Sequence, residues 1–216
     1  SGFRFDVIDE LTNNMVYQIA QTLKHEPTFD SQNATMIGEV WEDLSTKEAY
    51  GERKHYLTHN TLDSAMNYVY KDALFGFFES KDATNLLDNI LRIIENYPKD
   101  CLDAMMNIIS SHDIERALTR LAKGSANGHD RYWQAQNDFL SQEEYLRGKE
   151  LLKLIATIQF FLPGNPCIYY GDEAGVYGFG DPFNRKTYPW GREDVELVEF
   201  FKKLGAIRTS EEYLKD

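Results

Sequence analysis

Cysteine and histidine are scarce, and this limits the chemistry that the chain can support. The two cysteines, Cys101 and Cys167, lie far apart, which is too few for a disulfide framework or a zinc knuckle. We expect both to be buried thiols. The five histidines form no H-x-x-H or H-E-x-x-H pair, and the glycine-rich stretch 171–180 lacks both phosphate-cradling signatures. Metalloprotease and nucleotide-binding functions are therefore not expected.

Positive charge and long apolar runs are also lacking. Lys and Arg total 23 against 35 Asp and Glu, a net charge of −12 that repels phosphate backbones and anionic lipid. We expect neither nucleic acid nor a membrane as partner. No apolar run reaches the ~18 residues of a membrane span, and the N-terminus has no signal-peptide layout. The compartment stays open, with the cytoplasm favoured over secretion.

Apolar runs of strand length alternate with segments of helical period, which predicts an α/β fold. The length of 216 residues suits one domain or part of one. The spacing of the strands leaves room for one crossover helix each, as in a (β/α) barrel or a doubly wound sheet, although five strands do not close an eight-stranded barrel. The predicted strands are 2–8, 34–40, 62–68, 104–110 and 167–170.

Helices are predicted between these strands. One stops near Pro27, and an apolar stripe over 86–97 marks another. Ser141 and Glu144 form an S-x-x-E capping box that opens a helix through about Leu162. The remaining predictions are a long loop over 123–140 and a last helix that turns Val195, Leu197, Val198, Phe201 and Leu204 inward.

Polar residues lie at or just after the carboxyl ends of the predicted strands. Asp6 is late in the first, Glu39 late in the second and Asn67 late in the third, while His112 and Asp113 come just after the fourth. The carboxyl ends of parallel strands build the functional site of such folds. We therefore expect these side chains to reach one edge of the sheet.

The residue types at this edge suit glycoside hydrolysis. Arg4 and Asp6 are two positions apart on a strand, so they share a face, and the guanidinium favours an ionised carboxylate. Glu39 has apolar neighbours and Trp41 two positions on, a setting that favours a protonated carboxyl group. A charged and a protonated carboxyl about 5 to 5.5 Å apart define a retaining glycosidase. Asp113 would add a third negative charge.

Each residue also has an ordinary explanation. Asp6 alone reads as a turn or helix cap, Glu39 as part of an acidic loop, and Asp113 as the cap of a helix over 114–122. A divalent metal bound by the same Asp, Glu and His side chains is a further alternative. The aromatic residues of the last loop are core or loop filler, or stack on sugar rings: Tyr169, Tyr170, Tyr177, Phe179, Tyr188 and Trp190.

Three segments, in this order, resemble signature segments of the α-amylase family of glycoside hydrolases. They are GFRFD (2–6), IGEVW (37–41) and SHD (111–113). LDSAMNY (62–68) and the segment 163–190 are similar to the neopullulanase, cyclomaltodextrinase and amylopullulanase branch. The resemblance covers nearly the whole chain.

The resemblance implies a role for each matching residue. Asp6 matches the catalytic nucleophile, Glu39 the general acid/base and Asp113 the aspartate that stabilises the transition state. The implied substrate contacts are Arg4, His112, Asp181, Arg185 and Trp41. The implied substrates are α-glucans: starch, maltooligosaccharides, pullulan or cyclodextrins.

The resemblance also implies a partial (β/α)8 TIM barrel, strands four to eight with their helices, over 1–216. Strands one to three, the inserted domain, the residues of the structural calcium site and the trailing β-sandwich have no counterpart. We expect no cofactor for this chain, a structural calcium belonging to a full-length enzyme. Unpaired sheet edges predict self-association and little or no hydrolysis by the chain alone. The alternative function is a non-catalytic carbohydrate-binding or scaffolding relative.

Overall fold

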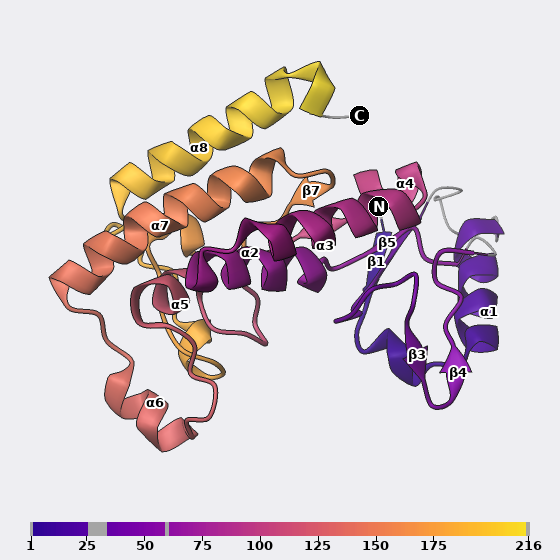
Figure 1. Cartoon of the computed structure of the whole chain (residues 1–216), viewed down its shortest axis with the longest axis horizontal. Coiled ribbons are helices and arrows are strands. Elements are labelled where there is room, and N and C mark those ends of the chain that lie inside the picture. The colour runs from indigo at the N-terminus through magenta and orange to yellow at the C-terminus, as the bar shows by residue number, and fades with distance from the viewer. Residues whose placement is uncertain (1, 26–33, 59–60, 215–216) are drawn as a thin grey trace. The chain divides into compact units, whose positions relative to one another are not determined.

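The computed structural model describes residues 2–25, 34–58 and 61–214. Helices and strands alternate along the chain (Figure 1), which confirms the α/β class. The chain divides into two compact units. The first unit comprises Ser1–Phe77, Asp82–Asn107 and Pro163–Asn165, and the second comprises Phe78–Lys81, Ile108–Leu162 and Pro166–Asp216.

A parallel sheet organises the first unit. Its order is β1 (Gly2–Phe5), β2 (Thr35–Gly38) and β5 (Ser64–Ala65). Phe5 pairs with Gly38, which places the ends of β1 and β2 side by side. The pairing continues from Met66 to Met106, in parallel. The other short strands are β3 (Glu48–Ala49), β4 (Glu52–Arg53), β6 (Met106–Asn107) and β7 (Asn165–Pro166).

The strands are shorter than predicted, and the fifth is misplaced. The prediction of a strand over 167–170 is wrong, because residues 167–170 have no strand pairing. The backbone carbonyls there find side-chain donors instead: Gln159 donates to Cys167 O at 3.1 Å, and Arg116 donates to Tyr170 O. These donors satisfy carbonyl groups that a neighbouring strand would otherwise satisfy.

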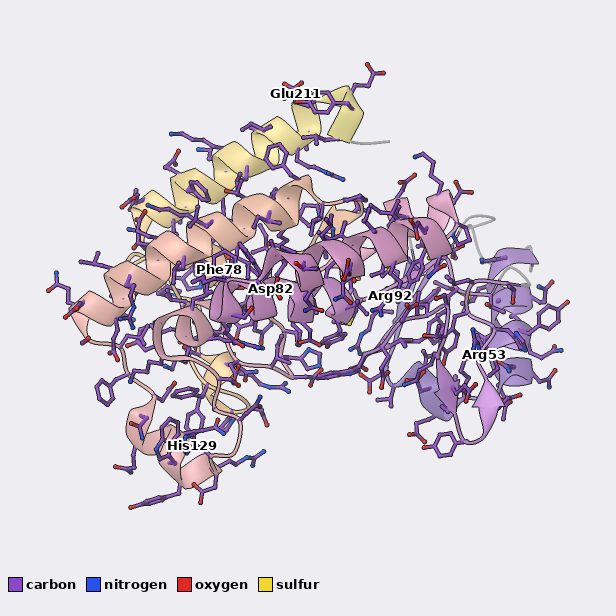
Figure 2. The ribbon with its side chains drawn as sticks, viewed as in Figure 1. Arg53, Phe78, Asp82, Arg92, His129 and Glu211 are labelled. Atoms are coloured by element: carbon purple, nitrogen blue, oxygen red, sulfur yellow. The ribbon has the colours of Figure 1, made fainter. Side chains whose placement is uncertain are left out.

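The helices of the first unit confirm the predicted alternation. They are η1 (Ile8–Glu10), α1 (Asn13–His25), α2 (Tyr68–Ser80, ending in the second unit), α3 (Ala83–Asn96) and α4 (Lys99–Asp103). The predicted stop near Pro27 lies outside the described residues. On α3 the apolar stripe is only partly covered, since Leu87 and Leu91 are exposed while Ile93 is buried. Figure 2 shows Arg92 on the same helix, where it pairs with Asp43 at 3.2 Å.

The second unit is helical. It contains α5 (Ala117–Lys123), α6 (Arg131–Asn137), α7 (Gln142–Phe161), η2 (Asp172–Ala174), η3 (Phe183–Arg185), α8 (Val195–Ser210) and η4 (Glu212–Leu214). The capping box of Ser141 and Glu144 at the start of α7 is confirmed. Gly148 lets α5 and α7 approach closely, because a Cβ there would lie 2.9 Å from the Ala122 Cβ.

Two predictions for this unit need correction. The predicted loop over 123–140 contains α6, whose start is capped by Asp130 accepting from Trp133 N at 2.8 Å. The ring of His129, labelled in Figure 2, stacks on Trp133 at 3.7 Å and steadies this turn. On α8, Leu197, Phe201 and Leu204 are buried as predicted, whereas Val195 is 70% exposed at the first helical position.

The apolar core follows these elements. In the first unit the sheet residue Met36 is buried together with Leu74 and Phe75 of α2. In the second unit Leu118 of α5 and Ile155 of α7 are fully buried. No helix in the described ranges has both the length and the apolar character needed to cross a membrane.

Candidate active site

Two carboxyl-bearing residues follow neighbouring parallel strands of the first unit. Asp6 comes directly after β1, and Glu39 directly after β2. The amide N–H of Glu39 donates to the carbonyl of Phe5 at 2.9 Å, which extends the strand pairing to these positions. The predicted arrival of Asp6 and Glu39 at one edge of this sheet is confirmed.

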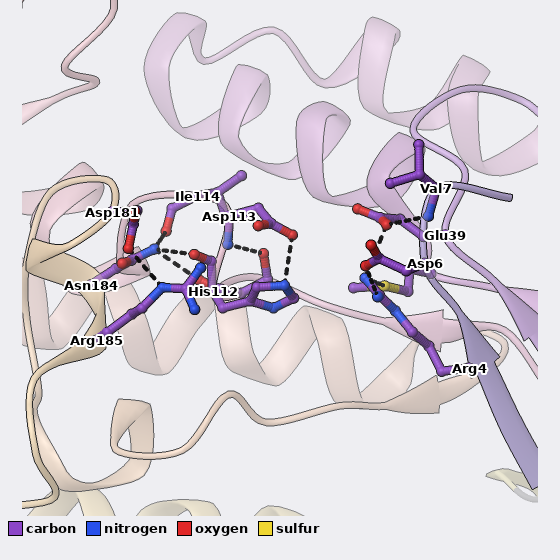
Figure 3. A network of polar contacts seen from close by, with 12 residues as sticks. Arg4, Asp6, Val7, Glu39, His112, Asp113, Ile114, Asp181, Asn184 and Arg185 are labelled. Atoms are coloured by element: carbon purple, nitrogen blue, oxygen red, sulfur yellow. Dashed lines mark hydrogen bonds and ion pairs between the residues drawn. The ribbon is translucent and has the colours of Figure 1, made fainter. Parts of the chain in front are cut away.

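One guanidinium joins the two carboxylates (Figure 3). Arg4 Nη1 pairs with Asp6 Oδ1, and Arg4 Nη2 lies 3.2 Å from Glu39 Oε2. The prediction that Arg4 and Asp6 share a face of the strand is thereby confirmed. The two carboxylates differ in environment, because the Asp6 side chain is 74% exposed and that of Glu39 only 6%. Asp6 is thus open to a ligand, whereas Glu39 is buried.

Two further donors fix the buried carboxylate. Val7 N donates to Glu39 Oε2 at 2.8 Å, and Trp41 Nε1 donates to Glu39 Oε1 at 3.2 Å. Val7 has φ 42° and ψ 49°, in the left-handed region. A β-branched residue there costs on the order of 1 to 3 kcal/mol, and such strain gathers at functional sites. This strained turn aims the Val7 amide at Glu39.

Trp41 is itself held in place. Its ring stacks on Tyr68 at a centroid distance of 4.2 Å and an interplanar angle of 10°. The buried ammonium of Lys71 lies 5.3 Å from the centre of the Tyr68 ring and 5.8 Å from that of Trp41, within range of a cation–π attraction. Trp41 remains 42% exposed. It therefore supports Glu39 and still offers ring surface to a ligand, and its predicted substrate contact stays a prediction.

His112 and Asp113 form a pair in the second unit. His112 Nε2 lies 3.0 Å from Asp113 Oδ2, and Asp113 N donates to Ser111 Oγ at 3.1 Å. The alternative that Asp113 caps the next helix is wrong, because α5 begins at Ala117 and its N-cap is Arg116. The carboxylate is thus left for another role.

Asn184, which sequence reasoning missed, organises the backbone of this pair. Its Nδ2 donates to the carbonyls of Ser111, His112 and Ile114 at 3.3, 2.9 and 2.8 Å (Figure 3). The residue is completely buried. One amide thereby fixes the turn that presents His112 and Asp113.

Sequence reasoning also missed Arg116. It is completely buried, donates from Nε to Asn184 O at 2.8 Å and pairs from Nη1 with Asp172 Oδ1 at 3.0 Å. Its guanidinium also lies 4.0 Å from the centre of the Tyr169 ring. Burial raises the pKa of Asp172 to about 6, although the positive charge of Arg116 opposes the shift. A lone Arg in a polar segment gives no sequence signal of burial.

Asp181 and Arg185 pair with each other. Arg185 Nε lies 2.8 Å from Asp181 Oδ1, and Arg131 Nη2 approaches Asp181 Oδ2 at 3.6 Å. The side chains of Asp181 and Arg185 are about half exposed, so both remain accessible. Their predicted hold on a sugar stays a prediction.

The predicted site residues thus form two described clusters. The first unit holds Arg4, Asp6, Glu39 and Trp41, and the second holds His112, Asp113, Asp181 and Arg185. Asn67, the polar residue of the third strand, is buried and donates from Nδ2 to Asn107 Oδ1 at 2.9 Å, a structural contact. Over 2–25, 34–58 and 61–214, no three His, Cys, Asp or Glu side chains gather as metal ligands do.

Comparison with known proteins places these clusters in a family context. Residues 1–216 match the family model described as the alpha amylase catalytic domain. An amylopullulanase from Thermoanaerobacter thermohydrosulfuricus is 34% identical over 99% of this chain and 14% of its own length. A cyclomaltodextrinase from Geobacillus thermopakistaniensis is 29% identical over 96% of this chain and 30% of its own length. The chain therefore spans less than a third of these relatives.

Solved structures of similar fold point to the same family. The cyclic α-maltosyl-(1→6)-maltose hydrolase from Arthrobacter globiformis, in complex with maltose, has a TM-score of 0.78 and 25% identity, covering 100% of this chain and 42% of its own. A cyclomaltodextrinase structure has a TM-score of 0.75 and 28% identity, covering 99% and 31%. These similarities indicate part of a (β/α)8 barrel.

Proposed function

Because the chain belongs to the α-amylase catalytic-domain family, we propose that it carries the catalytic acids of a retaining glycoside hydrolase acting on α-glucans. The observation that carries the proposal is the bridging of Asp6 and Glu39 by Arg4 at the ends of two paired parallel strands. Retaining hydrolysis needs two carboxyl groups close together with different tasks. The contrast in exposure between Asp6 and Glu39 supports such a division.

In this mechanism Asp6 attacks the anomeric carbon while Glu39 protonates the departing glycosidic oxygen. Arg4 pairs with Asp6 and orients it for attack. Glu39 then accepts a proton from a water molecule, which attacks the anomeric carbon from the face that the leaving group vacated and displaces the Asp6 carboxylate, so the anomeric configuration is retained. The donors Val7 N and Trp41 Nε1 are suited to Glu39 after it has given up its proton.

We assign Asp113 to stabilising positive charge on the sugar ring in the transition state. His112 contributes a hydrogen bond to the same sugar, and the pair of Asp181 and Arg185 binds a glucose unit on the non-reducing side. Trp41 lines the acceptor side. Barrel strands four to eight are the part of the fold that we assign to the chain.

The proposed substrates are starch, maltooligosaccharides, pullulan or cyclodextrins. Support comes from relatives named amylopullulanase and cyclomaltodextrinase and from a neighbour solved with maltose. A relative named intracellular maltogenic amylase, from Bacillus subtilis and 24% identical, supports a cytoplasmic location. The runner-up function is a non-catalytic binding or scaffolding relative, but the chain has an acid at each of the three positions.

The proposal extends to the chain in isolation. Catalysis needs positioning to within about 1 Å, and the relatives are several times longer than this chain. We therefore propose feeble or no turnover by the chain alone, and association through its sheet edges.

The test is a reducing-end assay with maltooligosaccharides and pullulan. The chain is assayed alone and together with a polypeptide that supplies the preceding part of the barrel. Glu39→Gln should abolish the activity of the mixture, whereas the control Glu42→Gln, an exposed acid paired with Lys47, should retain it. Activity that survives Glu39→Gln would remove Glu39 as the acid. Equal turnover by the lone chain would show that the added segment is unnecessary.

A further inference from the structure

A cleft of about 660 Å³ lies within the second unit. Its walls come from the start of α7 and from the loop that runs between η2 and α8. Tyr145, Tyr177, Pro189, Arg192 and Glu193 are among the lining residues, and none of the residues assigned above to catalysis or substrate binding is. The volume is in the range of pockets that bind small organic ligands, and it suits an oligosaccharide of a few sugar units.

The framework of the cleft is rigid. Asp194 accepts from Tyr145 Oη at 2.8 Å and from Lys149 Nζ at 2.8 Å. Gly175 has φ 80°, and a Cβ there would lie 2.2 Å from Tyr145 Oη. This close approach requires glycine and ties the loop to α7. A preformed wall reduces the entropy that a ligand loses on binding.

The charges that line the cleft are balanced. Lys186 and Arg192 are positive, and Glu193 and Asp194 are negative. Lys186 is engaged, with Nζ 2.7 Å from Asp138 and 4.3 Å from the centre of the Tyr177 ring. A pocket with equal charges of both signs does not select a phosphate or another strong anion.

Two charged side chains are left for a ligand. In the described part of the chain, the side chains of Arg192 and Glu193 make no hydrogen bond or ion pair. The guanidinium supplies only donors, and the carboxylate supplies only acceptors. A hydroxyl group donates and accepts, so neighbouring hydroxyls of a sugar can satisfy both side chains.

Two aromatic residues lie next to a lining residue in the sequence. Tyr188 and Trp190 flank Pro189, and their ring centres are 4.5 Å apart. Trp190 is 80% exposed, so most of its apolar ring has no covering side chain. A flat apolar surface beside a donor and an acceptor matches a pyranose ring, which has apolar C–H faces and hydroxyls around its edge.

We propose that this cleft, with Trp190 at its rim and Arg192 and Glu193 inside it, is a second oligosaccharide-binding site. It would hold glucose units of the α-glucan on residues other than the proposed catalytic ones. The identity of the ligand as an α-glucan rests on the proposed function. The existence of the sugar site rests on the cleft itself.

The test is a titration of the chain with maltotriose and maltoheptaose, followed through the indole N–H signals of its three tryptophans. Trp190 reports on the cleft and Trp41 on the candidate active site, while Trp133 is a reference. The Trp190 signal should move in a saturable way. Arg192→Ala or Glu193→Ala, which leave the Trp190 signal in place, should weaken that binding by about tenfold, and Tyr132→Ala, a similarly exposed aromatic in the same unit, should not.

The outcomes separate the two proposals. A shift of Trp41 with no shift of Trp190, up to the solubility limit of the sugar, would overturn the cleft proposal and leave the proposed function standing. A shift of Trp190 alone would support the cleft and leave the catalytic assignment unsupported. An equal response to β-linked cello-oligosaccharides would support a sugar site but refute its selectivity for α-glucans. Undiminished affinity in both cleft variants would overturn the site.

Discussion

The buried pair of Arg116 and Asp172 predicts an unusual pH dependence of stability. Asp172 is 1% exposed, and burial raises its pKa to about 6 despite the nearby guanidinium. In an unfolded chain the pKa of an Asp is about 3.9. The folded state therefore holds the Asp172 proton more tightly than the unfolded state does.

The size of the effect follows from this difference. About two pKa units, at about 1.4 kcal/mol each, amount to roughly 3 kcal/mol. Below about pH 4 Asp172 is protonated in both states and contributes no penalty. Between about pH 4 and pH 6 the unfolded state loses its proton first, so the contribution of Asp172 to the free energy of unfolding falls. Above about pH 6 the loss is complete.

Asp172→Asn removes the titrating group. Urea unfolding of both proteins, at several pH values between about 4 and 7, gives the difference in free energy of unfolding. This difference, wild type minus variant, should fall by about 3 kcal/mol as the pH rises across that range. Asp88→Asn on the exposed face of α3 controls for the loss of one negative charge. A difference that is constant, or that rises with pH as for a carboxylate stabilised by its partner, would refute the reasoning.

Three further predictions concern single side chains. Trp41→Phe keeps a ring for Tyr68 but removes the donor to Glu39, so kcat of the chain combined with the polypeptide that supplies the preceding part of the barrel should fall by about tenfold to a hundredfold with KM little changed; an unchanged kcat in steady-state kinetics would contradict this. Burial raises the pKa of Cys101 to about 12, so at about pH 8 a thiol reagent should modify Cys101 only after urea unfolding; rapid labelling of Cys101, as distinct from the half-buried Cys167, in the folded chain would contradict this. Ser141→Ala removes the capping box of α7 and should lower the free energy of unfolding by about 1 kcal/mol, measured in urea.

The arrangement of Arg4, Asp6 and Glu39 could be predicted because it depends on local rules. Side chains two apart on a strand share a face, and parallel neighbours end at the same edge of a sheet. The capping box of Ser141 was equally predictable, since its partners are three residues apart. Each of these features needs only short-range sequence information.

The buried polar residues could not be predicted in this way. Arg116 binds groups 54 to 68 positions away, and Asn184 reaches back 70 to 73 positions. Such contacts exist only once the loop after β7 has folded back. The same contacts replace strand pairing at Tyr170, which explains why an apolar run of strand length forms no strand. Similarly, the Asp130 side chain caps and stabilises α6, although the apolar residues of that segment do not recur with a helical period.

The most direct test of the central claim is to identify the residue that becomes glycosylated during turnover. A fluorinated α-glucosyl fluoride, which slows hydrolysis of a glycosyl-enzyme, is incubated with the chain and the polypeptide that supplies the preceding part of the barrel. Peptide mass spectrometry should then find one sugar on Asp6, and none in an Asp6→Asn variant. A sugar on another residue, or turnover with inversion of the anomeric centre and no adduct, would contradict the assignment of Asp6 and Glu39.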